Sequence, residues 1–156
     1  MNWDAIGALS ESIGALAVII SLVYLALQIR AQTREARLQS SFQITEAFRE
    51  AISSLQNLER AKLTIDALKD IDALDDAERL QFNAICQRYL RVWEQAHYQY
   101  TEGHLDSQMW ESIHETYVDL MGEKAIQSVW EVRKHTYRKS FRDYVGGLTF
   151  RSYELR

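Results

Sequence analysis

The stretch Ser12–Ile29, SIGALAVIISLVYLALQI, runs for eighteen residues without a charged side chain. About 20 predominantly apolar residues in a helix cross the ~30 Å hydrocarbon layer of a membrane, so this stretch predicts one transmembrane helix. Three arginines follow it between residues 30 and 37, whereas only acidic charges precede it. A cleaved signal peptide has the opposite arrangement. Because basic flanks stay in the cytoplasm, we expect an uncleaved helix with its N-terminus outside and the rest of the chain inside.

The rest of the chain contains few residues that break helices. The sequence has no proline, and none of its six glycines lies between Gly14 and Gly103. The single cysteine, Cys86, cannot form an intramolecular disulfide, which fits a reducing cytoplasm. We therefore predict an all-α protein in which one N-terminal transmembrane helix continues into a cytoplasmic helical bundle. The expected parts are the transmembrane helix over residues 1–30, the helical domain over 31–145 and a C-terminal tail over 146–156.

An apolar stripe beyond the arginines predicts that the first helix continues into the cytoplasm. Its members recur every three or four residues, which is the spacing of one face of an amphipathic helix. The acidic segment DALKDIDALDDAE, residues 66–78, breaks this pattern. The stripe consists of Leu38, Phe42, Thr45, Phe48, Ile52, Leu55 and Leu58.

Capping residues mark the next two helices. Asp75 or Asp76 is suited to begin a helix over residues 77–102, because its carboxylate accepts hydrogen bonds from free backbone N–H groups. Gly103 is suited to end that helix, and Asp106 to begin the next one. The sequence GHLD therefore predicts a tight turn between two antiparallel helices.

Two shorter helices are expected after this hairpin. The helix that begins after Asp106 should end at Gly122, and another should cover residues 124–137. The segment SFRDYV adds a helical turn, and the last nine residues are expected to fray or to depend on a partner. Trp93 and Trp110 are the expected anchors of an aromatic core.

Charge is distributed unevenly along the chain, although the net charge is only −4. Residues 64–123 carry thirteen acids and four bases, and residues 124–156 carry three acids and eight bases. This pattern favours electrostatic complementarity within the domain or between subunits. An alternative is a basic C-terminal segment that contacts anionic lipid. Because the bases are scattered and the chain is acidic overall, we expect no nucleic-acid partner.

Small and polar residues recur along one side of the predicted transmembrane helix. A seven-residue repeat of such residues is typical of helices that pack closely in bilayers, so it predicts a homo-oligomer. Bulky residues such as Ile13 and Ile20 fall on the opposite side and suit lipid. One alternative is a plain anchor, and another is a cation pore with Glu11 facing its axis. The oligomer or pore face consists of Gly7, Ser10, Glu11, Gly14, Ala17, Ser21 and Gln28.

The segments WEQAH and WESIH place Glu94-x-x-His97 on one predicted helix and Glu111-x-x-His114 on the next. Two such pairs on neighbouring helices form half of a di-iron carboxylate site, and Glu131 is a candidate for a further ligand. However, the tryptophan before each glutamate is the expected core anchor, so each glutamate should point toward solvent or an edge. We therefore expect no metal and no cofactor.

Signatures of catalysis are missing from the sequence. It contains no glycine-rich phosphate loop, no CxxC pair and no serine-centred elbow, so we expect no enzymatic activity. The segments NWDAIGALSESIGALAVIISLVYLALQIR, YLRVWEQAHYQYTEGHLD and SVWEVRKHTYRKSFRDYV together resemble a group of small bacterial membrane proteins. In that group a single N-terminal span precedes a helical domain. The resemblance implies a bacterial inner membrane and carries over no functional residues.

These observations favour a single-span membrane protein that self-assembles through its transmembrane and cytoplasmic helices, as a scaffold or a sensor subunit. Its expected partners are the lipid bilayer and other copies of itself. One alternative is a homo-oligomeric ion channel, and another is a membrane-tethered metal-binding protein. The expected location is the inner membrane, with a periplasmic N-terminus and a cytoplasmic C-terminal domain.

Overall fold

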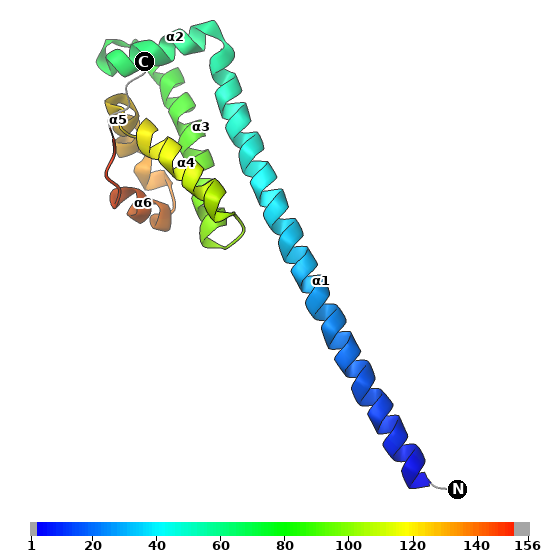
Figure 1. Cartoon of the computed structure of the whole chain (residues 1–156). Helices are drawn as coiled ribbons and strands as arrows, with labels where there is room; N and C mark the ends of the chain where they lie inside the picture. Colours follow the sequence, from blue (N-terminus) through cyan, green and yellow to red (C-terminus); the bar gives the residue numbers. More distant parts are fainter. Residues whose placement is uncertain (1–2, 152–156) are drawn as a thin grey trace. The chain divides into compact units, whose positions relative to one another are not determined.

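The computed structural model describes the backbone of residues 3–151 and the side chains of residues 11 and 13–151. These residues form helices and connecting turns and contain no strand, which confirms the predicted all-α class. The α-helices are α1 (Trp3–Ser53), α2 (Leu58–Lys69), α3 (Asp76–Thr101), α4 (Ser107–Leu120), α5 (Lys124–Arg133) and α6 (Lys139–Gly146) (Figure 1). Three short 3₁₀ helices accompany them, namely η1 (Ser54–Gln56), η2 (Ile71–Ala73) and η3 (Lys134–Thr136).

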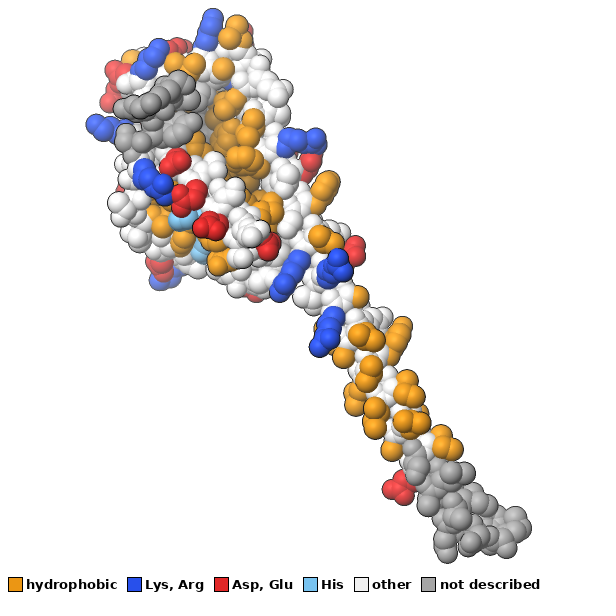
Figure 2. Space-filling view, in the orientation of Figure 1, with side chains coloured by type: hydrophobic (Ala, Val, Ile, Leu, Met, Phe, Trp, Pro, Cys, Tyr) orange, Lys and Arg blue, Asp and Glu red, His pale blue; other side chains and the backbone are white. Residues whose placement is uncertain are grey.

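The chain divides into two compact units, residues 1–38 and residues 39–156. The first unit is the N-terminal part of α1, and its large apolar side chains between Ile13 and Ile29 are 51% to 65% exposed. Figure 2 shows these side chains covering the helix, with basic side chains following them. The mean hydropathy reaches 2.0 over an eighteen-residue window, none of which is buried. By length and composition, α1 is the one helix in the described range that is able to cross a membrane.

The second unit is a helical domain built around α3. The part of α1 beyond residue 39 packs along α3, where the Ser40 hydroxyl donates a hydrogen bond to the Gln99 side chain over 3.3 Å. Further along α1, Glu50 pairs with Arg88 of α3 at 3.8 Å, so the two helices run antiparallel. Helices α2, α4, α5 and α6 also contact α3, and α2 contacts α5 (Figure 1).

Aromatic side chains form the centre of this domain. The Trp93 ring is fully buried and stacks on the Tyr117 ring of α4, with 5.0 Å between the ring centroids. The Phe141 ring of α6 lies nearly perpendicular to the same indole, with 5.2 Å between the ring centroids. The main cluster of buried residues is Leu90, Trp93, Tyr117, Met121, Trp130, Tyr137, Phe141 and Val145.

The predicted hairpin of α3 and α4 is confirmed almost to the residue. The Asp75 carboxylate accepts a hydrogen bond from the Glu78 N–H, and the Glu78 side chain accepts one from the Asp75 N–H, which is a complete capping box. Gly103 follows α3 with a φ of 73°, a conformation that side-chain-bearing residues rarely adopt. The Asp106 carboxylate then accepts hydrogen bonds from the first N–H groups of α4.

The predicted apolar stripe on α1 is wrong in two respects. First, α1 ends at Ser53, and the Asn57 side chain caps a separate helix, α2, by accepting from the N–H groups of Glu59 and Arg60. Second, much of the stripe lies outside the core, since Phe42 is 69% exposed and Leu58 is 68% exposed. Leu38 and Ile52 of the stripe are exposed as well.

The buried side of α1 consists of residues that do not belong to the stripe. Ile44 is 2% exposed and Ala51 is 0% exposed, and Ser40 is buried beside them. Ile44 belongs to a cluster with Ala96 of α3 and Leu105. The prediction therefore chose the wrong side of α1, because the spacing of large apolar residues does not say which side meets α3.

The C-terminal segment packs more closely than its predicted fraying implies. Leu148 and Phe150 are half-buried against the main aromatic cluster. The Arg151 side chain forms an ion pair with Glu115. The Arg151 carbonyl oxygen occupies the space that a Cβ at residue 122 would need, so only glycine fits at this position. The expectation of a frayed end was thus wrong for these residues.

Candidate functional site

An apolar pocket of about 500 Å³ opens in the helical domain. Its walls come from α1, η1, α2, α3, α4 and α5, and large aliphatic or aromatic side chains make up most of them. Phe48, Leu68, Ile85, Leu120 and Ile126 are half-buried wall residues that belong to these helices. Figure 2 shows apolar side chains gathered on the surface of the domain. The volume falls within the range of about 300–1,000 Å³ that small-molecule sites occupy.

The thiol and two of the phenols in the pocket wall are held neutral. Burial raises the pKa of the Cys86 thiol to about 12, so the thiolate that acts as a nucleophile is essentially unpopulated at neutral pH. Burial also raises the pKa values of the Tyr89 and Tyr117 phenols. The pocket therefore suits binding of apolar groups rather than nucleophilic chemistry.

Two carboxylates stand among the wall residues near the C-terminal end of α4. Asp119 lies in the last turn of this helix, and Glu123 begins α5 without making a side-chain capping bond. Neither forms an ion pair with another residue in the described range.

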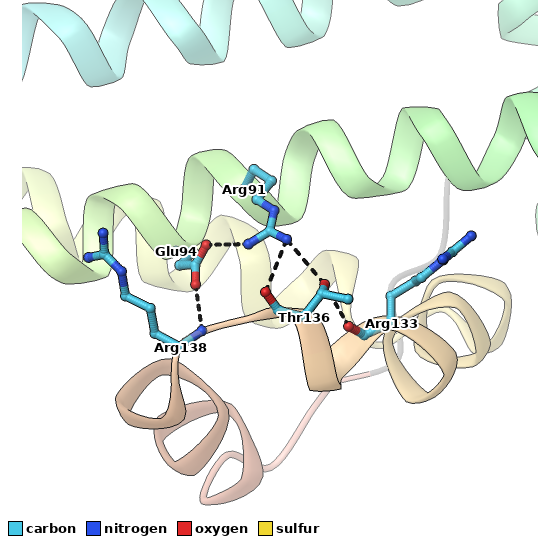
Figure 3. Close-up of polar contacts among 5 residues, drawn as sticks. All are labelled: Arg91, Glu94, Arg133, Thr136 and Arg138. Atoms are coloured by element: carbon cyan, nitrogen blue, oxygen red, sulfur yellow. Dashed lines mark hydrogen bonds and ion pairs between the residues drawn. The ribbon is translucent and has the colours of Figure 1, made fainter.

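Glu94, one of the four metal-ligand candidates, joins α3 to the loop between η3 and α6 (Figure 3). Its Oε1 accepts a hydrogen bond from the Arg138 backbone N–H over 2.7 Å, and its Oε2 accepts one from Arg91 Nη1 over 2.7 Å. Arg91 Nη2 also donates to the backbone and side-chain oxygens of Thr136, at 3.2 Å and 3.1 Å. We call Arg91, Glu94, Thr136 and Arg138 the Glu94 network.

The predicted edge position of Glu94 is wrong, because Glu94 is only 8% exposed, and His97 is buried to the same extent. The loop after η3 covers Glu94, and α4 and α6 supply the rings around His97. The His97 ring stacks on Tyr144, with 4.5 Å between centroids, and also contacts Trp110 at 5.7 Å. A central helix such as α3 has neighbours on several sides, so the residue after a core tryptophan can also be buried.

The other two metal-ligand candidates are less buried than Glu94 and His97. Glu111 is exposed, whereas His114 is half-buried with its Nδ1 hydrogen-bonded to the Tyr144 hydroxyl. Glu131, the further candidate, is exposed and pairs with Lys134. Among the described residues, no three histidine, cysteine, aspartate or glutamate side chains gather in a geometry that suits a metal ion.

Burial of His97 predicts a dependence of stability on pH. Desolvation lowers the pKa of His97 below its ordinary value of 6.5, although the neighbouring Glu94 charge opposes this shift. The unfolded chain therefore binds the proton more readily than the folded chain does. The stabilising contribution of neutral His97 is complete above about pH 6.5 and is lost as the pH falls below it.

This dependence is measurable by thermal unfolding at about pH 7.5 and about pH 5.5. The melting temperature should be lower at the lower pH, and His97→Gln should make this difference smaller. His104→Gln is the matched control, because His104 is exposed and should leave the difference unchanged. An unaltered difference in His97→Gln would mean that His97 is not the group responsible.

Residues of the predicted oligomer face are exposed where the structure describes them. Glu11, Ala17, Ser21 and Gln28 are all exposed, and a Cβ built at Gly14 meets no atom within 4 Å. The Ser21 hydroxyl donates a hydrogen bond to the Ala17 carbonyl oxygen within α1 over 2.8 Å. Gly7 and Ser10 lie outside the residues whose side chains are described.

Comparison with known proteins assigns this chain to no family. No family model matches this chain, and neither a curated protein nor a solved structure is significantly similar to it. Function must therefore be inferred from the two units themselves.

Proposed function

We propose that this chain is a single-span protein of the bacterial inner membrane that self-assembles through α1, as a scaffold or a sensor subunit. The observation that carries the proposal is the exposure of the apolar part of α1. Eleven large apolar side chains between Ile13 and Ile29 are more than half exposed within the chain. Burying one such side chain gains about 1.5–3 kcal/mol, so this surface is expected to lie in lipid or against another copy.

The charges that flank the apolar segment support a direction of insertion. Arg30, Arg34 and Arg37 follow it and are exposed, whereas Glu11 precedes it. Basic residues close to a span are retained in the cytoplasm. The helical domain is accordingly cytoplasmic and the N-terminus periplasmic.

A reporter that is active only in the cytoplasm, fused to the C-terminal end of the chain, is expected to be active. The complementary reporter that works only in the periplasm is expected to be silent. Replacing all three arginines by glutamine should weaken this preference, because the retention signal is removed. Periplasmic activity of the unaltered fusion would refute the proposed orientation.

Self-assembly is supported by the small residues of α1 and by one large residue beyond them. Lipid chains are as apolar as leucine, so close approach of backbones and interhelical hydrogen bonds are what drive association in a bilayer. Gly14, Ser21 and Gln28 are seven residues apart, and Phe42 continues the same spacing fourteen residues later. Phe42 is 69% exposed in a part of α1 that water surrounds in this topology. Its burial against a second copy would therefore add a hydrophobic contribution.

Two substitutions are expected to weaken the oligomer. Gly14→Ile places a branched side chain where the single chain offers open space, so any effect must come from a neighbouring copy. Phe42→Ser removes an exposed aromatic ring. Each is expected to raise the dissociation constant of the oligomer by about tenfold. The measurement is the number of subunits per particle as the protein is diluted in nanodiscs or detergent.

Matched controls separate assembly from folding. Ile20→Leu changes the opposite side of the apolar segment, and Leu80→Ser removes an equally exposed apolar side chain from α3. Neither should alter the subunit count. If Gly14→Ile and Phe42→Ser assemble as the unaltered chain does, the proposed face is wrong. A monomer at every concentration would refute self-assembly itself.

A further inference from the structure

We propose that the apolar pocket of the helical domain binds a small amphiphile with a hydrocarbon body and a positively charged head group. This inference goes beyond self-assembly and does not depend on it. All the wall residues belong to the unit of residues 39–156, so the pocket is complete within one copy of the domain.

The body of the ligand is inferred from the pocket's interior. Its volume of about 500 Å³ lies in the middle of the range for small-molecule sites. Phe82 and Cys86 line it from α3, and Leu68 and Leu120 line it from α2 and α4. The thiol and the nearby phenols are neutral at pH 7 because burial raises their pKa values. A hydrocarbon chain or ring gains by entering such a space, whereas a polar body would lose its hydration without compensation.

The charge of the head group is inferred from the part of the wall that carries charge. Asp119 and Glu123 are half-buried, and neither has an ion-pair partner among the described residues. An ammonium group is attracted to this arrangement, and a carboxylate or sulfate is repelled.

The single cysteine provides a direct test in the full chain. Cys86 is the only thiol in the sequence and belongs to the pocket wall, so a ligand in the pocket should shield it from N-ethylmaleimide. Because burial keeps the thiol protonated, modification is slow at neutral pH, and the reaction is followed over hours at about pH 9. The chain is held in nanodiscs, and the rate of modification is measured with decylamine, decanol or decanoate at equal concentration. Decylamine at about ten times its dissociation constant should slow the reaction by about tenfold, because only unoccupied pockets react. Decanoate should slow it much less.

Two pairs of variants connect this protection with the pocket. Leu68→Trp fills the space and should abolish the protection, whereas Ile65→Trp lies on the same helix outside the wall and should keep it. Comparing rates with and without the amphiphile in each variant removes any direct effect of the tryptophan on Cys86.

The second pair tests the charge and remains informative if Leu68→Trp fails to fold. Combined Asp119→Asn and Glu123→Gln should bring protection by decylamine down to that by decanol. Glu111→Gln removes an exposed carboxylate of α4 that does not belong to the wall and should change nothing. Equal protection by decanoate and decylamine in the unaltered chain would refute the cationic head group. The absence of protection by all three compounds would refute the binding site.

Discussion

Trp93→Ala is expected to lower the stability of the helical domain by about 3–5 kcal/mol, the usual cost of deleting a fully buried tryptophan. The Trp93 side chain is completely buried, and three rings surround it. It stacks on Tyr117, with 5.0 Å between the centroids, and packs edge-to-face with Phe141 and Tyr144, with centroid distances of 5.2 Å and 5.7 Å. Because these rings come from α4 and α6, the cavity would weaken the contacts of α3 with both helices.

The loss should appear as a fall in melting temperature of about 10 °C or more for a domain of this size, measured on the full chain by near-ultraviolet circular dichroism. Trp110→Ala is expected to cost about 1–2 kcal/mol, because Trp110 is only half-buried and stacks on the exposed Tyr100 ring. Leu80→Ala on the solvent side of α3 should stay within about 0.5 kcal/mol. A change within error for Trp93→Ala would contradict the described core.

Glu94→Ala is expected to destabilise the same domain by about 2 kcal/mol, because it leaves the part-buried Arg138 N–H without its acceptor. The Arg91 side chain is 46% exposed, so its charge remains hydrated after the change and adds little to the cost. The Glu94 network also fixes the loop before α6, and its loss should therefore loosen the α6 contact with Trp93.

Glu94→Gln distinguishes the hydrogen bond from the charge. The amide oxygen can still accept from the Arg138 N–H, so the expected cost is about 1 kcal/mol. Glu131→Ala is the matched control on the surface, where an exposed pair with Lys134 contributes less than about 0.5 kcal/mol. Chemical denaturation of the full chain measures all three differences. Equal losses in Glu94→Ala and Glu94→Gln would assign the effect to charge rather than to the N–H acceptor.

Helix-capping residues in the sequence correctly predicted where α3 ends and α4 begins. Asp75, Gly103 and Asp106 each act within one helical turn of their own position, and the α3–α4 hairpin was located from them. Asn57 is another helix-capping residue, and the sequence-based prediction missed it. Its side-chain oxygen caps α2, so the segment QNLER marks the break between η1 and α2 that the apolar periodicity concealed.

The candidate site depends on packing between residues far apart in the sequence, and for that reason it escaped prediction. The pocket wall combines residues from Phe48 to Ile126, and no spacing along the chain signals that they converge. The Glu94 network similarly joins α3 to a loop more than forty residues later. The buried side of α1 was misjudged because the spacing of its large apolar residues does not say which side meets α3.

Helix α3 lies in the middle of the chain, and its position sets an order of folding. The α3–α4 contact closes a short loop at little entropic cost, whereas the Ser40–Gln99 hydrogen bond joins residues separated by 59 positions. During synthesis, α1 leaves the ribosome before α3 exists, so Ile44 and Ala51 stay uncovered until their partner helix has been made. We therefore expect the domain to be completed from its middle outward, with the C-terminal part of α1 among the last elements to pack.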